Sequence, residues 1–233
     1  MKKEKKPKIN SNKNLKNIWG NKFDTSEINR RNRKIIIKNY FSLSIKKITL
    51  ISMMVTLNIV VSAFSKFVIG MVPINGFFVL EVSFFTILIF LLITNLFYTI
   101  FFIQMTTWFR VAFGDEWVGL LAMDLIDSYF IIIFAFILFI VKYLMVKFKT
   151  PNILNKVFWL QIPIFIIVIL LTAGFGTLLN WGFLLTIYGM PEQTQIGYLP
   201  IIFGLNIAKY SINVLIFMLL YKPVLILIKN YQF

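Results

Sequence analysis

An all-α integral membrane protein is the fold class that this sequence predicts, and three observations lead to it. Hydrophobic residues make up 59% of the 233 residues and charged residues only 14%, whereas a soluble domain carries about 25% charged residues. The apolar residues form runs of about 20 or more, the length that an α-helix needs to cross a bilayer. The charges are segregated, because 15 of the 24 lysines and arginines lie between Lys2 and Lys47. We therefore predict a basic arm, 1–47, and a transmembrane domain, 48–230.

Six transmembrane helices are predicted from the apolar runs. The run 77–109 carries one charge, Glu81, and is too long for a single crossing, so we place a turn at "ITNLFY", 93–98. The fifth helix is long enough that we expect it to be bent. The predicted helices are 48–69, 78–94, 96–112, 117–142, 158–188 and 200–229. An even number of crossings puts both termini on one side of the membrane.

The loop charges predict which side that is. The connection between the fourth and fifth helices and the C-terminal tail contain only basic charges: Lys142, Lys147, Lys149, Lys156, Lys222 and Lys229. The opposite loops, "GMVPING", "RVAFGDEW" and "GMPEQTQIGYLP", hold one arginine and three acids. Basic loops face the cytoplasm, so we predict a multi-pass protein of the cell membrane with both termini cytoplasmic. Lys66, at the outer end of the first helix, is the exception.

The basic arm has two interpretations, nucleic-acid binding and a position at the membrane. A basic segment directly before a first transmembrane helix marks the cytoplasmic side and contacts anionic lipid, so we expect no nucleic-acid partner. Few apolar residues precede Ile35, which predicts that the arm is disordered or lies along the membrane surface.

The residues available for catalysis are few. The chain has no cysteine and no histidine, which excludes thiol chemistry, disulfides and imidazole ligands, and it has no P-loop motif for a nucleotide. Asp124 and Asp127, at i and i+3, could hold a metal in a membrane enzyme of lipid metabolism. We favour the interpretation that the two aspartates form a polar cluster that neutralises Arg110 or Lys209 or contacts a ligand. We therefore predict no enzyme, no metal site and no cofactor, and keep the lipid enzyme as the alternative.

A lysine inside the last apolar run is the strongest sign of a functional site. Lys209 stands in "FGLNIAKYSIN", 203–213, and a charge inside a membrane span is expensive enough to indicate function. Asn206, Lys209 and Asn213 follow a spacing of i, i+3 and i+7, which places them on one face of a helix.

The last two predicted helices carry a family resemblance. "LLTAGFGTLLNWGFLLTIYGMP", 170–191, and "PIIFGLNIAKYSINVLIFMLLYKPV", 200–224, resemble the last two helices of the riboflavin-binding S component of energy-coupling-factor (ECF) vitamin transporters. The matching letters are Leu179-Asn180, Tyr188-Gly189-Met190-Pro191, Leu205-Asn206, Lys209 and Leu220-Tyr221-Lys222. The resemblance covers residues 48–230, with six helices in the same order.

The resemblance is looser in the first half of the chain. In "VPINGFFVLEVSFFTILIF", 72–90, Glu81 and Ser83 match the acid and the serine of the family pattern. The departures from the family's residues are Val79, Phe84, Thr86, Thr94-Asn95-Leu96 and Leu120. The resemblance makes riboflavin the first expected ligand. Because of these departures, folate or another vitamin is kept as the alternative.

The resemblance implies a substrate-binding subunit that captures a vitamin from outside and works with a transmembrane coupling subunit and two ATPase subunits. A flavin needs an apolar slot and a few convergent polar groups, and asparagine complements its imide edge with a donor and an acceptor. The expected substrate-binding residues are Asn180, Asn206, Lys209, Glu81, Ser83 and Asp124. Asn213 we interpret as a hydrogen bond between helices. The loop 70–78 is expected to cover the site.

The same resemblance places the contact with the coupling subunit on the first helix. The family's signature there is A-x-x-x-A, and this chain has Ser52 and Thr56, again two small residues at i and i+4. Small residues let helices approach closely in lipid. Packing inside the chain is the alternative interpretation of this pair.

Overall fold

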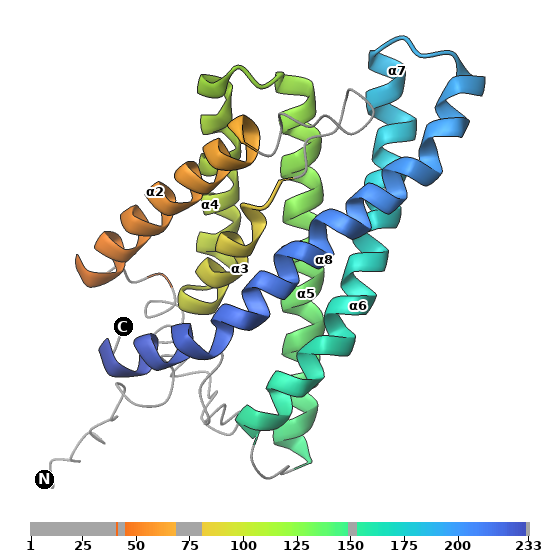
Figure 1. Cartoon of the computed structure of the whole chain (residues 1–233). Coiled ribbons are helices and arrows are strands. Elements are labelled where there is room, and N and C mark those ends of the chain that lie inside the picture. The colour runs from red at the N-terminus through yellow and green to blue at the C-terminus, as the bar shows by residue number, and fades with distance from the viewer. Residues whose placement is uncertain (1–40, 42–44, 69–80, 149–152, 232–233) are drawn as a thin grey trace, which may run out of the picture.

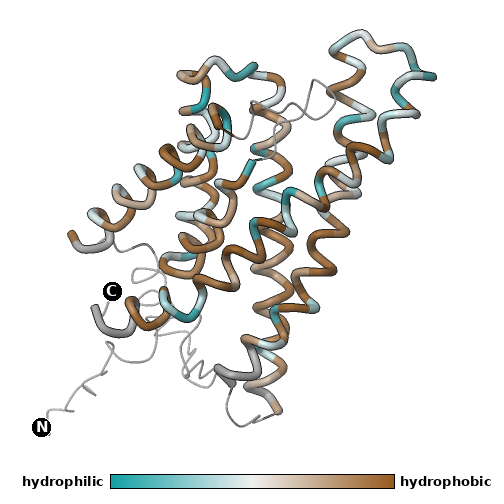
Figure 2. Tube along the Cα trace, in the orientation of Figure 1, coloured by the Kyte–Doolittle hydropathy of each residue, from teal (hydrophilic) through white to brown (hydrophobic). Residues whose placement is uncertain are grey.

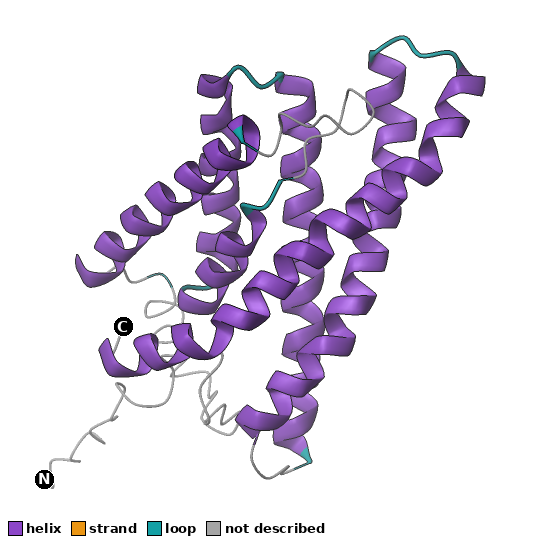
Figure 3. Cartoon of the chain, viewed as in Figure 1, coloured by secondary structure: helices purple, strands orange, loops and turns teal. Residues whose placement is uncertain are grey.

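The computed structural model describes residue 41 and the ranges 45–68, 81–148 and 153–231, and over these residues it contains helices and no strand (Figures 1 and 3). A short 3-10 helix, Arg110–Phe113, follows α4, and a π-helical turn, Asn180–Leu184, joins α6 to α7. The helices are α2 (Ile45–Phe67), α3 (Phe84–Ile93), α4 (Leu96–Phe109), α5 (Trp117–Lys147), α6 (Ile153–Leu179), α7 (Leu185–Ile187) and α8 (Glu192–Tyr231). Most of the predicted arm, 1–47, and the whole predicted covering loop, 70–78, lie outside the described residues.

Five helical stretches are long and apolar enough to cross a membrane. In an 18-residue apolar window of each stretch, between 22% and 39% of the residues are buried. Apolar residues extend along nearly the full length of these helices (Figure 2). Apolar surface on this scale belongs in lipid rather than in water, which makes the chain an all-α membrane-embedded protein. The stretches are Ile48–Phe67, Leu96–Phe113, Trp117–Met145, Phe158–Ile187 and Glu192–Leu227.

The second predicted helix, 78–94, is much shorter than expected. The helix α3 has 10 residues, about 15 Å, which is half of the ~30 Å hydrocarbon core. Tertiary hydrogen bonds hold the backbone before it: the Val82 amide donates to the Ser65 hydroxyl (3.2 Å), and the Glu81 carbonyl accepts from Asn213 (2.8 Å). Because side chains of α2 and α8 satisfy these groups, this segment does not need to be helical at membrane depth. Six full crossings are therefore not found among the described residues.

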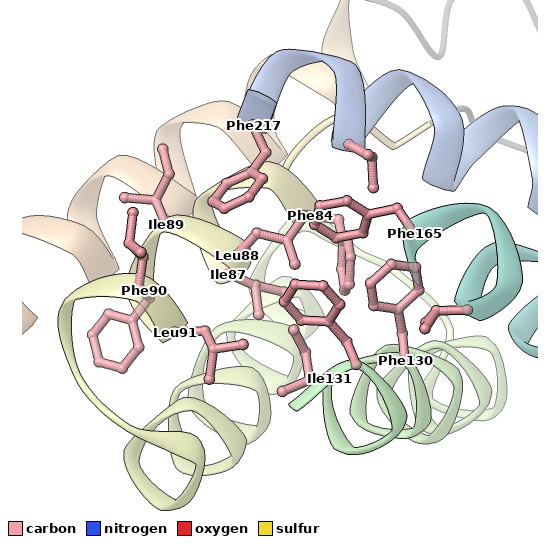
Figure 4. Packing of buried hydrophobic residues seen from close by; sticks show 14 of the residues in the cluster. Phe84, Ile87, Leu88, Ile89, Phe90, Leu91, Phe130, Ile131, Phe165 and Phe217 are labelled. Carbon is pink, nitrogen blue, oxygen red and sulfur yellow. The ribbon is translucent and has the colours of Figure 1, made fainter. Parts of the chain in front are cut away.

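The short helix α3 lies at the centre of the bundle. All its residues except Phe85 and Ile93 are buried, and it contacts α2, α4 and α8. A helix that is apolar all round is stable only where other helices surround it. Its side chains pack against Phe130 of α5, Phe165 of α6 and Phe217 of α8 (Figure 4).

Two predicted boundaries have clear local causes. The predicted turn at 93–98 is confirmed, because α3 ends at Ile93 and the Asn95 side chain caps α4 by accepting a hydrogen bond from the Tyr98 amide (3.0 Å). Before α5, Gly114 adopts a φ of 78°, a left-handed conformation that glycine adopts without a steric penalty. The connection between α4 and α5 can therefore turn sharply.

The last two long helices extend beyond their predicted limits. The helix α6 begins at Ile153 instead of residue 158 and contains Pro163. Within the range of the predicted bent helix, 158–188, the regular α-helix ends at Leu179 and the chain continues as the π-helical turn Asn180–Leu184. The helix α8 begins at Glu192 instead of residue 200 and has 40 residues. That is about 60 Å of helix, twice the hydrocarbon thickness, and α8 accordingly crosses the bundle on a diagonal (Figure 1).

The described chain begins and ends on the same side of the bundle. The start of α2 and the end of α8 both lie at its lower end in Figure 1, while the connection between α4 and α5 and the start of α8 form its upper end. This agrees with the predicted path of the chain. The assignment of the lower end to the cytoplasm stays a prediction.

Candidate functional site

Six charged residues with low exposure form one connected network near the upper end, which we call the charged cluster. Its basic residues pair only with its acidic residues, and their charges sum to zero. The distances between ion-pair atoms are 2.5 Å for Lys66–Asp115, 2.7 Å for Arg110–Asp115, 2.5 Å for Arg110–Glu81, 3.6 Å for Lys209–Glu81 and 3.0 Å for Lys209–Asp127. The cluster therefore joins the end of α2, the connection between α4 and α5, the segment before α3, and the interiors of α5 and α8.

The carboxylate of Glu81 is the centre of this network. One of its oxygens accepts a hydrogen bond from the Ser83 hydroxyl (2.6 Å) and pairs with Arg110, while the other faces Lys209 and has no hydrogen-bond partner. Glu81, Ser83 and Lys209, three of the expected substrate-binding residues, therefore lie close together. Their contact with a ligand stays a prediction.

Lys209 is held inside the bundle by Asp127. Its Nζ donates to Asp127 Oδ1 at 3.0 Å, and the Tyr210 hydroxyl donates to the same oxygen at 2.6 Å. Only 12% of the Lys209 side chain is exposed, so its charge depends on these neighbours. An ammonium group has three donors, and Asp127 uses one of them.

The two aspartates of α5 have different partners. Asp124 accepts a hydrogen bond from Gln104 of α4 (2.6 Å), and its other oxygen is buried without a partner. Of the two aspartates predicted to neutralise Arg110 or Lys209 or to contact a ligand, Asp127 binds Lys209 and Asp124 binds Gln104. A ligand contact of Asp124 stays a prediction. A step of three residues turns the side chain by about 60° around the helix, enough to face α8 instead of α4. Among the described residues, no three acidic side chains gather as metal ligands would.

Two of the predicted site residues, Asn180 of the π-helical turn and Asn206 of α8, lie near one glycine of α6. Asn180 and Asn206 are both buried, and Asn180 donates to the Gly176 carbonyl at 2.7 Å while Asn206 donates to the Ile202 carbonyl at 3.0 Å. A Cβ on Gly176 would lie 3.0 Å from Asn206 Nδ2, so α8 approaches α6 closely because Gly176 has no side chain. Both asparagines are buried, as a shared site requires.

Asn213 acts as a link between helices, as predicted. It donates to the Glu81 and Lys209 carbonyls, both at 2.8 Å, and accepts from the Phe85 amide at 2.9 Å. These bonds use both the donor and the acceptor ends of its amide. Asn213 therefore fixes the start of α3 against α8 and leaves ligand contacts to its neighbours.

Ser52 and Thr56 lie on the outer face of α2. Both side chains are exposed, and their hydroxyls donate to carbonyls of their own helix, Ile48 (3.1 Å) and Ser52 (3.0 Å). The alternative that they pack inside this chain is therefore wrong for the described residues. Their polar groups are satisfied locally, which suits contact with lipid or with another helix.

Arg110 is the main site residue that was not among the expected substrate-binding residues. It stands in "WFRVAFGDEW" at the end of a predicted helix, and the sequence offered it only as an alternative partner of Asp124 and Asp127. In the structure its side chain is 10% exposed and bridges Glu81 and Asp115. Lys66, the exception to the loop-charge pattern, is explained by the same network, because Asp115 neutralises it.

A narrow polar cleft runs beside the charged cluster between α2, α3, α4 and α5. It has no room for a water molecule, so its polar groups face one another directly. Its lining residues are Asn58, Ser62, Glu81, Ser83, Ile87, Thr106, Thr107, Arg110, Met123 and Asp127.

No known protein family matches the sequence, and no curated protein is significantly similar to it. The functional assignment therefore rests on the residues and the geometry described above.

Proposed function

We propose that this protein is the substrate-binding subunit of an ECF-type vitamin transporter and that riboflavin is its first candidate ligand. The observation that carries the proposal is Lys209, a lysine inside a long apolar helix: among the described residues its ammonium group makes one hydrogen bond, to Asp127, which balances its charge. Asn206 precedes it by one turn on α8. Asn180, in the π-helical turn after α6, donates to the carbonyl of Gly176, the glycine that Asn206 faces. Three polar side chains thus converge on one region of an apolar bundle, the pattern of a small-molecule site.

The chemistry of these residues suits a flat ligand with a polar edge. Asparagine offers a donor and an acceptor side by side, and lysine offers donors to a carbonyl or ring nitrogen. Glu81 adds a buried oxygen without a hydrogen-bond partner, which could accept from a ligand hydroxyl. Folate or another vitamin with a comparable edge is the alternative ligand within the same proposal.

Below the site the bundle is closed by aromatic rings, which we call the aromatic core: Phe84, Phe130, Phe134, Phe165 and Phe217. Successive rings lie 4.4 Å apart for Phe134–Phe165 and 5.8 Å apart for Phe165–Phe217. A site entered from the upper end fits a subunit that binds its substrate and relies on partners for transport. With the predicted topology, the upper end faces outside.

The proposed partners are a transmembrane coupling subunit and two ATPase subunits. The exposed pair Ser52 and Thr56 supports a docking face on α2, because small side chains with satisfied hydroxyls allow close helix contact. The chain has no P-loop motif, so ATP hydrolysis would come from the partners.

The first experiment is purification of the protein from membranes in the presence of riboflavin. We expect a yellow preparation with flavin absorbance at about one ligand per chain. Lys209→Ala and Asn206→Ala should each weaken riboflavin binding by roughly five- to a hundredfold, since loss of one partner of a buried polar ligand atom costs about 1–3 kcal/mol. The measurement is isothermal titration calorimetry on folded protein in detergent.

The matched control is Lys222→Ala. Lys222 is on the same helix, is exposed and lies over the Phe158 ring at 5.3 Å, far along α8 from Lys209, so its loss should leave the affinity unchanged. Unaltered riboflavin affinity in both Lys209→Ala and Asn206→Ala would contradict the proposed site, and an absence of binding by the wild type would contradict riboflavin as the ligand.

A further inference from the structure

Glu81 lies between two cations that hold it to different extents. Arg110 Nη1 is 2.5 Å from one carboxylate oxygen, whereas Lys209 Nζ is 3.6 Å from the other. The first distance is that of a charge-assisted hydrogen bond, and the second is too long for one. Glu81 is therefore bound to Arg110 and only attracted to Lys209.

Arg110 is itself fixed from the other side. Its Nε donates to Asp115 at 2.7 Å, and its Nη1 also donates to the sulfur of Met123 at 3.1 Å. Lys66 binds the second oxygen of Asp115 at 2.5 Å. A guanidinium presents its donors in a rigid fork, so these contacts set the position from which Arg110 holds Glu81.

We propose that Arg110 is a positioning residue of the binding site: by holding Glu81 it keeps the donors of Lys209 free for the ligand. This inference rests on the proposed function. Lys209 has three donors, of which Asp127 uses one. Without Arg110, the Glu81 carboxylate would be a buried charge whose nearest remaining cation is Lys209, and a shift of less than 1 Å would form a second hydrogen bond. A ligand would then have to compete with two carboxylates for the ammonium group.

The test is a double-mutant cycle between Arg110 and Glu81 with riboflavin as the probe. Arg110→Gln should weaken riboflavin binding about tenfold in the wild-type background, the usual size of one lost hydrogen bond to a charged group. In the Glu81→Gln background the same substitution should cost less than about threefold, because no carboxylate is left to capture Lys209. Arg110→Lys, which keeps a cation beside Glu81, should bind within about threefold of the wild type.

Lys222→Gln is the control, since it removes an exposed cation of α8 that lies outside the charged cluster and leaves the Arg110–Glu81 contact in place. It should bind riboflavin like the wild type. Thermal unfolding in detergent reports whether each variant is folded, and if Arg110→Gln does not fold, the comparison of Glu81→Gln with the double variant and the affinity of Arg110→Lys carry the test.

The outcomes separate the inference from the function on which it rests. Normal affinity of Arg110→Gln, or an equal loss in both Glu81 backgrounds, would overturn the positioning role while a weakened Lys209→Ala upholds the site. A wild-type protein that does not bind riboflavin would overturn the proposed function and this inference with it.

Discussion

The charged cluster and the aromatic core lie next to each other in one bundle and are held together in different ways. In the charged cluster, Lys66, Arg110 and Lys209 each have an acidic partner within 3.0 Å. In the aromatic core, Phe134 and Phe165 stack at 4.4 Å with an angle of 9° between their rings. In lipid there is no hydrophobic driving force between helices, so the aromatic core is stabilised by shape complementarity and close packing. The charged cluster is stabilised by ion pairs and hydrogen bonds.

This difference has a functional consequence. A hydrogen-bonded group can exchange one partner for another, so under the proposed function a ligand would replace an internal contact of the charged cluster. Stacked rings have no hydrogen-bond partners to exchange, and displacing one ring opens a cavity in the packed core. Phe84 marks the boundary, because its ring packs edge-on against both Phe130 and Tyr210 at about 5 Å, and Tyr210 donates to Asp127 of the cluster.

The largest expected effect breaks the core and leaves the cluster intact. Phe134→Ala should lower the free energy of unfolding by about 3–5 kcal/mol, because it removes a fully packed ring, while the folded fraction keeps its riboflavin affinity. Chemical unfolding in detergent and calorimetry measure the two quantities. Phe136→Ala on the same helix is the control: this ring is 61% exposed, so its loss should change stability by only about 0.5 kcal/mol. Equal losses of stability in Phe134→Ala and Phe136→Ala would contradict the conclusion that close packing stabilises the aromatic core.

A smaller effect should appear where the site depends on close helix contact. Gly176→Ala places a methyl group 3.0 Å from Asn206 and 3.2 Å from Ile126, so the Asn206 side chain must shift. We expect riboflavin affinity to fall about tenfold, the loss expected for one displaced hydrogen-bonding group, with little loss of stability because alanine favours the helix.

Gly174→Ala, two residues earlier on α6, is the control for this substitution. A methyl group there would meet nothing within 4 Å, so affinity should be unchanged. Equal affinities of the two variants, measured by calorimetry, would show that the Gly176–Asn206 contact does not shape the site.

The smallest effect on either region is expected from the outer face of α2. Ser52→Trp and Thr56→Trp change exposed residues, so binding and stability should stay within about 0.5 kcal/mol of the wild type. Riboflavin uptake by cells should be lost, because the large ring prevents close docking of another helix. Met53→Trp, at a position that is exposed and already bulky, should transport normally. Normal uptake by Ser52→Trp and Thr56→Trp would remove the docking face from α2.

The sequence by itself determined where the long helices lie and that a charge stands inside one of them. Hydropathy depends on each segment's own side chains, so the stretches at 48–67, 117–145 and 158–187 could be predicted closely. The turn at 93–98 could be predicted as well, because its cap, Asn95, bonds a residue only three positions away. Lys209, Asn206 and Asn180 were found for the same reason, since an intramembrane polar residue is conspicuous in its own segment.

Only the tertiary structure decided which groups pair. Asp127 rather than Asp124 contacts Lys209, and Arg110 binds Glu81, 29 residues away in the chain. These choices depend on how each helix is rotated about its axis and on where neighbouring helices cross, which no local pattern contains. The length of α3 was decided in the same way, because Ser65 of α2 and Asn213 of α8 satisfy the backbone that would otherwise have continued as helix.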